Sequence, residues 1–164
     1  MAVHILDDLK MLILLTIANG TPVMLRAALK DRWAHALDRG LLWSDGRPLL
    51  GKTKTIRGFL IALLLTTVSG TILGINWLGA LLIALAALAG DLFSSFVKRR
   101  MGLPASSMAL GLDQIPESLF PCLVGMAFLS LSVFDIAVIV GAFFAGELLL
   151  SRVLYRLHIR ERPY

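Results

Sequence analysis

The chain has 164 residues, of which 57% are apolar, a net charge of +5 and a mean hydropathy of +0.81. Soluble domains are usually about 45–50% apolar, so this composition excludes an ordinary soluble protein and predicts an all-α integral membrane protein. We expect residues 1–164 to form a single transmembrane domain without a nucleic-acid partner. The lone cysteine, Cys122, excludes an intramolecular disulfide and a cysteine-only metal site.

Five apolar segments are candidates for transmembrane helices, at residues 9–29, 59–76, 77–97, 118–134 and 136–155. Apart from Lys10, all Lys and Arg residues lie in three clusters, at 26–57, 98–100 and 152–162. With five spans, all three clusters fall on one side, which the positive-inside rule makes cytoplasmic. The prediction is a multi-pass protein of the cell membrane with the N-terminus outside, the C-terminus cytoplasmic and the active site at the cytoplasmic face.

The first span contains Asn19 and Pro22, and the proline predicts a kink because it lacks a backbone donor. Asn19 either faces a polar cavity or makes an interhelical hydrogen bond. Arg26 is expected to extend to the cytoplasmic interface.

The loop before the second span formally matches a P-loop at residues 46–53, GRPLLGKT. No buried strand precedes it and the chain has no room for a nucleotide-binding sheet, so we interpret the match as false. The segment GKTKTIRG at 51–58 nevertheless leads into a helix N-terminus, which favours phosphate, and it carries Lys52, Lys54 and Arg57. The alternative role of these cations is simple anchoring at the membrane surface.

The third span ends in the most informative segment, GDLFSSFVKRRMGLPASSMALGLD at 90–113. Asp91, Ser94, Ser95 and Lys98 share one helix face. An acid within a membrane helix costs roughly 2.5–3.5 kcal/mol, so Asp91 needs either a salt bridge or a metal ion. Carboxylates bind Mg²⁺ that bridges phosphates, and Asp113 is a second candidate ligand.

Glu117 shares the helix face of Asp113 if the fourth span starts early. Lys98, Arg99 and Arg100 are candidate phosphate donors, or else cytoplasmic anchors. In the fifth span, Glu147 either pairs locally or reaches into the cavity.

The chain resembles the CDP-archaeol synthase family in four motifs: ANGTPV at 18–23, LGKTKTIRGF at 50–59, GDLFSSFVKRRMG at 90–102 and LDQ at 112–114. That family is a compact relative of the phosphatidate cytidylyltransferases. The resemblance implies an enzyme that joins CTP to a membrane lipid phosphate, giving a CDP-lipid and pyrophosphate, with Mg²⁺ as cofactor. The lipid is of the archaetidic or phosphatidic acid type.

The resemblance also implies roles for individual residues. Asp91, Lys98 and Asp113 are implied to be catalytic, with Asp91 and Asp113 as metal ligands. Contacts to CTP or to the lipid phosphate are implied for Asn19, Lys52, Thr53, Lys54, Thr55, Arg57, Ser94, Ser95, Arg99 and Arg100. One position departs from the family, because Pro116 stands where members often carry another acid; Glu117 follows as a possible replacement ligand.

Two alternatives to an enzyme are a small-anion transporter and a non-catalytic membrane scaffold. A small-anion transporter would use Asp91 and Glu147 as coupling acids, but the predicted outer face has only tight turns. A non-catalytic membrane scaffold would tolerate replacement of these acids. Gly70 and Gly74 form one small-residue pair compatible with a homodimer.

Overall fold

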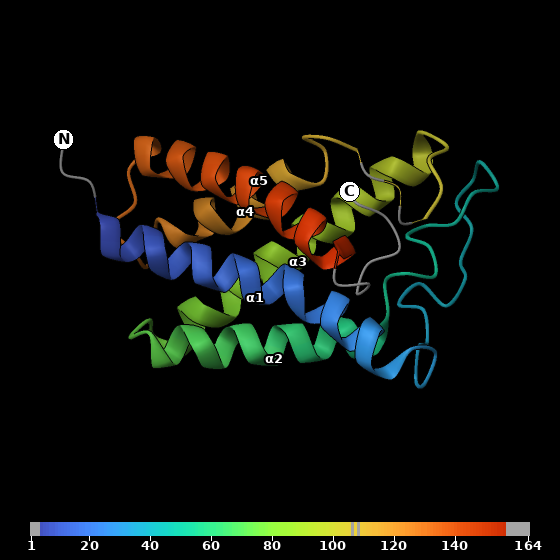
Figure 1. Cartoon of the computed structure of the whole chain (residues 1–164), viewed down its shortest axis with the longest axis horizontal. Coiled ribbons are helices and arrows are strands. Elements are labelled where there is room, and N and C mark those ends of the chain that lie inside the picture. The colour runs from blue at the N-terminus through green and yellow to red at the C-terminus, as the bar shows by residue number, and fades with distance from the viewer. Residues whose placement is uncertain (1–3, 106, 108, 157–164) are drawn as a thin grey trace.

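The computed structural model describes residues 4–105, 107 and 109–156, and in them the chain forms a bundle of five α-helices (Figure 1). The helices are α1 (Ile5–Leu29), α2 (Ile56–Ile72), α3 (Trp77–Arg100), α4 (Gln114–Gly125) and α5 (Val133–Arg156). The predicted all-α class and the five helical segments agree with this architecture. Within the described part of the chain, the false P-loop is followed by no sheet, and β-pairing is limited to two isolated bridges in the 30–55 connection.

Helix length separates the five segments. Ile5–Leu29, Trp77–Arg100 and Val133–Val153 are long and apolar enough to cross a membrane, which supports a multi-pass membrane protein. α2 has 17 residues, near the lower limit for a span. α4 has only 12 residues, so it is about 18 Å long against a hydrocarbon core of about 30 Å.

The fourth predicted span, 118–134, therefore differs from the helix that forms, which begins at Gln114 and ends at Gly125. The connection at 101–113 folds back into the bundle, so that α4 begins beside the middle of α3 (Figure 1). The backbone of Pro116 touches α3 at Gly90, where an added Cβ would lie 2.3 Å from the proline carbonyl oxygen. The early start that would bring Glu117 into the fourth helix is the one observed, since α4 begins at Gln114.

The bundle has two different ends, which we call the loop end and the turn end. The loop end carries the connections 30–55 and 101–113, and the turn end carries 73–76, 126–132 and the start of α1 (Figure 1). The predicted grouping of long and short connections is thus found in the structure, while the side of the membrane that each end faces stays a prediction. The basic cluster at 152–162 lies outside the described residues beyond Arg156.

An apolar core fills the bundle toward the turn end. Its fully buried members come from α1, α3, α4 and α5 and include Met11, Leu14, Leu15, Ile83, Cys122 and Ile139. Small residues let the helices approach closely, since a Cβ added at Gly70 of α2 would lie 2.6 Å from the Cβ of Ala80 in α3. The most extensive helix contact is between α3 and α4.

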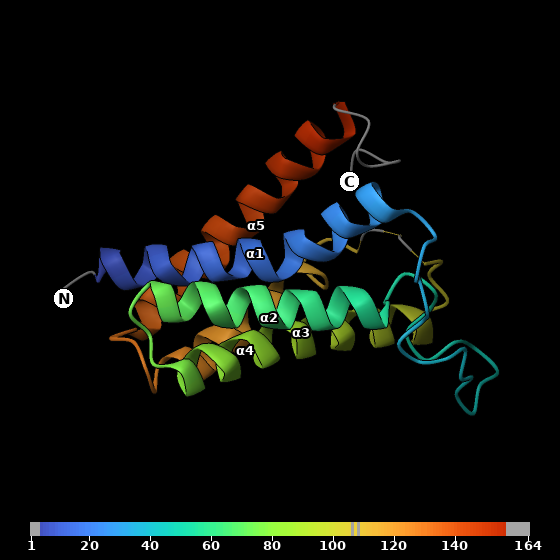
Figure 2. The same cartoon turned by 90° about the horizontal axis from the view of Figure 1, so that it is seen from below.

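α5 is arranged differently from the other helices. It packs against α4 and α1, and its C-terminal part leans away from the bundle, as the second view shows (Figure 2). Glu147 and Ser151 of this part line a cavity at the loop end.

Candidate active site

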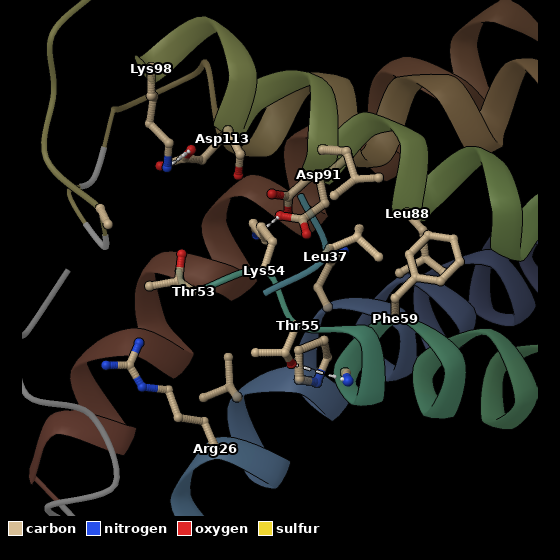
Figure 3. Close-up of a pocket in the computed structure, with 18 of the residues that line it drawn as sticks. Arg26, Leu37, Thr53, Lys54, Thr55, Phe59, Leu88, Asp91, Lys98 and Asp113 are labelled. Carbon is tan, nitrogen blue, oxygen red and sulfur yellow. Dashed lines mark hydrogen bonds and ion pairs between the residues drawn. The ribbon is translucent and has the colours of Figure 1, made fainter. Parts of the chain in front are cut away.

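A cavity of about 850 Å³ lies at the loop end and receives side chains from all five helices and both long connections (Figure 3). This volume lies within the range of about 300–1,000 Å³ that is usual for small-molecule sites. Most of the residues predicted from sequence meet here: Asn19, Thr53, Lys54, Thr55, Asp91, Ser95, Lys98, Arg99, Asp113 and Glu117. Segments distant in sequence therefore form one site.

Four predicted residues are not part of the cavity lining. Lys52 is exposed, and Arg57 donates to backbone carbonyl groups of the 30–55 connection. Ser94 is buried and donates to a carbonyl of its own helix at 2.9 Å. Arg100 pairs with Asp45 and binds carbonyl groups of the same connection, so its contacts hold that connection onto α3.

Two lysine–aspartate ion pairs line the cavity (Figure 3). Lys54 reaches Asp91 from the 30–55 connection, and Lys98 contacts Asp113 at 2.5 Å. Burial lowers the pKa of Lys54, but the surrounding carboxylates, Asp91 foremost, outweigh burial and raise that pKa above its usual value. The partner that Asp91 requires is thus a lysine 37 positions away in sequence, which no local pattern indicated.

Glu117 and Asp91 line the same cavity and interact with each other. The two side chains lie within hydrogen-bonding reach of each other, because the close contact of Gly90 with Pro116 aligns α3 and α4 at this level. Asp113 is held by Lys98 and by the backbone N–H of Ala109, which donates to its carboxylate at 2.9 Å. The fold thus adds Glu117 to the carboxylates around Asp91, while the predicted pairing of Asp91 with Asp113 at a metal stays a prediction.

The donor chemistry of Asp91 and Glu117 suits a hard divalent cation. Mg²⁺ is commonly bound by one or two carboxylates, with water and substrate phosphates completing its shell. No cluster of three or more His, Cys, Asp or Glu residues that could hold a metal occurs among the described residues. Asp91 and Glu117 thus fit a cation that arrives with its substrate better than one held by the protein alone.

The N-terminus of α2 forms another wall of the cavity. Thr55 caps the helix, accepting a hydrogen bond from the backbone N–H of Gly58 at 3.2 Å, and both residues line the cavity. The helix dipole favours an anion at such a position. Lys54 precedes the cap directly, so two features that attract phosphate stand side by side.

The side chains of α3 also explain why the 101–113 connection folds inward. Lys98 donates to the carbonyl of Ser107 at 3.1 Å, and Arg99 donates to the carbonyl of Pro104 at 2.8 Å. These bonds, with the Lys98–Asp113 pair, fasten the connection beneath the end of α3. Both cations therefore have structural partners in addition to facing the cavity.

Several lining residues were missed by sequence reasoning. Leu37, Phe59 and Leu88 form an apolar part of the wall, and Lys30 and Asp31 lie at the end of α1. Ordinary leucines and surface charges give no sequence signal. The charged lining residues are balanced in sign: Arg26, Lys30, Lys54, Lys98 and Arg99 against Asp31, Asp91, Asp113, Glu117 and Glu147.

Asn19 lines the cavity, which agrees with the interpretation that it faces a polar cavity. Its amide nitrogen donates to the carbonyl of Leu15 on the same helix at 3.1 Å. This bond leaves the side chain on the cavity wall and uses one of its donors within α1.

A family model and several known proteins that are similar to this chain are described as CDP-archaeol synthases. A family model described as CarS-like, CDP-archaeol synthase, matches residues 75–164. A CDP-archaeol synthase from Sulfurisphaera tokodaii is 34% identical over 154 residues, covering 90% of this chain and 84% of that protein. A CDP-archaeol synthase from Pyrobaculum islandicum is 33% identical over 157 residues, covering 90% of this chain and 92% of that protein.

A solved structure is similar to most of the chain. It belongs to work on an intramembrane enzyme for archaeal membrane lipids biosynthesis. The TM-score is 0.67 at 30% sequence identity, and the match covers 84% of this chain and 90% of that chain. The likeness therefore extends over most of the chain.

Proposed function

The chain belongs to the CDP-archaeol synthase family, and from this premise we propose that it is a CTP-dependent lipid-phosphate cytidylyltransferase. An oxygen of the lipid phosphate attacks the α-phosphorus of CTP, the bond from the α-phosphorus to the bridging oxygen of the β-phosphate breaks, and pyrophosphate leaves. The observation that carries the proposal is the convergence of Asp91 and Glu117 with Lys54, Lys98 and Arg99 in one cavity at the loop end.

The nucleophile in this reaction is already an anion, so the site needs no strong base. The tasks left to the protein are to hold two phosphates in line and to stabilise negative charge on the leaving group. Lys54, Lys98 and Arg99 are placed to bind phosphate oxygens, Thr55 offers a hydroxyl donor, and the start of α2 adds the positive end of its helix dipole. No histidine or cysteine nucleophile is required.

Mg²⁺ is the proposed cofactor, with Asp91 and Glu117 as its protein ligands. The ion would supply charge neutralisation at the phosphates of the nucleotide. The lining carries equal numbers of acids and bases, so a polyanionic nucleotide needs a further cation to enter without excess negative charge. Glu117 would replace the acid that Pro116 displaces, and Asp113 would act chiefly through Lys98.

The two ion pairs suggest how the site changes when the nucleotide binds. In the structure Lys54 neutralises Asp91, and Lys98 neutralises Asp113. If Asp91 held a cation that neutralises its charge, Lys54 would be available to bind the phosphates. The lysine that stabilises the buried acid in the free protein would then bind substrate.

The lipid phosphate would approach from the side of α1 and α5. Both helices line the cavity, through Arg26 on α1 and Ser151 on α5, and they diverge toward the loop end (Figure 2). Apolar side chains such as Leu149 and Leu150 are exposed on α5, where hydrocarbon chains can lie. Toward the turn end the core is filled by residues such as Leu14 and Ile83, which supports an enzyme open at one end rather than a transporter.

The test is product formation by the purified protein in detergent or nanodiscs, with CTP and Mg²⁺. A diether isoprenoid phosphate and a diacyl phosphatidic acid are supplied separately, and products are weighed by mass spectrometry. We expect a CDP-lipid and pyrophosphate, loss of product with EDTA, and preference for one lipid. Absence of product with both lipids would contradict the proposal, and substrate flux into sealed vesicles without CTP would favour transport.

A further inference from the structure

A buried aspartate outside the cavity organises the 30–55 connection. The side chain of Asp38 is 6% exposed and does not line the cavity. One carboxylate oxygen accepts the backbone N–H of Gly40 at 3.0 Å, and the other accepts those of Leu50 and Gly51, both at 2.9 Å. Burial raises the pKa of Asp38, but the N–H donors, Gly51 foremost, outweigh burial and lower it overall. Such charge-assisted bonds are stronger than neutral ones.

These bonds fix the segment 51–55, which we call the phosphate loop, at its first residue. Gly51 has a φ of +96°, which a residue with a side chain adopts only with strain. Its carbonyl accepts the backbone N–H of Lys54 at 3.2 Å. The loop also touches α3 here, since a Cβ added at Gly51 would lie 3.3 Å from a terminal nitrogen of Arg99.

The segment 35–38 also fixes the far end of the phosphate loop. The backbone N–H of Leu37 donates to the carbonyl of Lys54 at 2.7 Å, and that of Ile56 donates to the carbonyl of His35 at 3.0 Å. Because Asp38 follows Leu37 directly, one short segment holds both ends of the phosphate loop. Lys54 is thereby constrained in its backbone before its side chain meets Asp91.

We propose that Asp38 is a positioning residue for the phosphates of the nucleotide: its carboxylate holds the phosphate loop so that Lys54 and Thr55 face the cavity. This inference rests on the proposed function, in which those two residues bind CTP. Asp38 acts through them and touches no substrate. The lipid phosphate approaches from α1 and α5, so the effect of Asp38 is selective for the nucleotide.

The test compares Asp38→Asn with Asp45→Asn. Asparagine keeps the size of Asp38 but places an NH₂ group toward backbone donors, whereas Asp45 lies in the same connection and outside the cavity lining. For Asp38→Asn we expect KM for CTP to rise about tenfold, with KM for the lipid phosphate within about twofold of wild type. Asp45→Asn weakens a partly exposed ion pair with Arg100, but the bonds from Arg100 to carbonyl groups of the connection remain. It should therefore leave KM for CTP within about threefold.

A second measurement needs no turnover. Hydrogen–deuterium exchange of peptides covering residues 50–56 should be faster in Asp38→Asn than in wild type, while exchange in α3 stays the same. Unchanged exchange and unchanged KM would overturn the inference. Equal rises in both KM values with faster exchange throughout the bundle would also overturn it, since Asp38 would then support the whole fold.

The two proposals fail in distinguishable ways. A wild-type protein that forms no CDP-lipid contradicts the proposed function and with it the role in nucleotide binding, whereas the exchange result separately decides whether Asp38 holds the loop. If Asp38→Asn does not fold, Gly51→Ala strains the same loop through the positive φ of that residue. It should raise KM for CTP selectively, and an unselective change would contradict the inference.

Discussion

The two ends of the bundle each contain an aspartate paired with a lysine, and the pairs differ in origin. At the turn end, Lys10 contacts Asp7 on the same helix at 2.9 Å, with both side chains 20% exposed. At the loop end, Lys54 contacts Asp91 from a separate connection, with side chains 24% and 17% exposed. Exposure is therefore nearly equal, and what marks the candidate site is that the second pair joins distant segments inside a cavity.

The surroundings of the two pairs also differ: one pair lies next to packed apolar residues, and the other lies in a charged cavity. Beyond Asp7 and Lys10, the interior is filled by apolar residues of α1 and α3 such as Met11 and Ile83. Around Lys54 and Asp91 the helices stand apart, and charged side chains line the space. A polar group near a packed core supports structure, whereas polar groups that converge on open space are available for a ligand.

The largest contrast is expected from the same substitution at both ends. Asp91→Asn should lower the rate of CDP-lipid formation about 10³-fold, because it removes a charge from the proposed metal pair. Asp7→Asn, the matched control, should stay within about twofold, since its pair is local and outside the cavity. Rates of the purified variants, measured by mass spectrometry, give the comparison. Equal losses of rate in the two variants would contradict the assignment of the active site to the loop end.

Two lysines of the phosphate loop provide the next contrast. The sequence predicted both as nucleotide ligands, but Lys54 lines the cavity whereas Lys52 is exposed and outside its lining. Lys54→Ala should reduce kcat/KM for CTP about 10²-fold, and Lys52→Ala should reduce it no more than about threefold. Steady-state kinetics on both variants test this. A larger loss for Lys52→Ala would place the nucleotide on the outer side of the loop.

A smaller effect is expected from the packed half. Ile83 is fully buried in the core, whereas Ile72 is 79% exposed. Ile83→Val should lower the free energy of unfolding by about 0.5–1.5 kcal/mol, and Ile72→Val should leave it nearly unchanged. Chemical unfolding in detergent gives the energies, and turnover per folded molecule should be equal in both. A loss of turnover in folded Ile83→Val would link the core directly to the site.

The smallest effect is the acid sensitivity of Asp38. Its native pKa lies below the ordinary value of 3.8, so its carboxylate contributes fully to stability above that value. As the pH falls from 3.8 through the native pKa, the unfolded state binds a proton more readily and the contribution is lost. The stability difference between wild type and Asp38→Asn should therefore shrink below about pH 4. A constant difference from pH 6 to about pH 3 would contradict this.

Much of the fold and of the site was predictable because the signals are local. The apolar segments predicted five helices, and the four motifs named most residues of the cavity, among them Asp91, Lys98 and Arg99. Residues such as Arg57 and Arg100 could not be separated from true lining residues in this way. A motif fixes residue type and spacing, whereas the direction of a long cationic side chain depends on which carbonyl groups lie nearby.

Asp38 illustrates a different limit. An aspartate followed by Arg39 and Gly40 in a polar loop is an ordinary turn in sequence. Its importance comes from Leu50 and Gly51, more than ten positions later, whose N–H groups it accepts. Contacts across that separation have no periodicity that a sequence pattern could reveal.

The sequence by itself determined that the protein lies in a membrane, that it is helical and which charged groups it carries. These properties follow from composition and from periodicity along one chain. Tertiary structure decided which groups meet. It placed Glu117 beside Asp91, because the close contact of Gly90 with the Pro116 backbone and the bonds from α3 draw the 101–113 connection into the bundle. That choice depends on distances between segments, and no spacing within one segment encodes it.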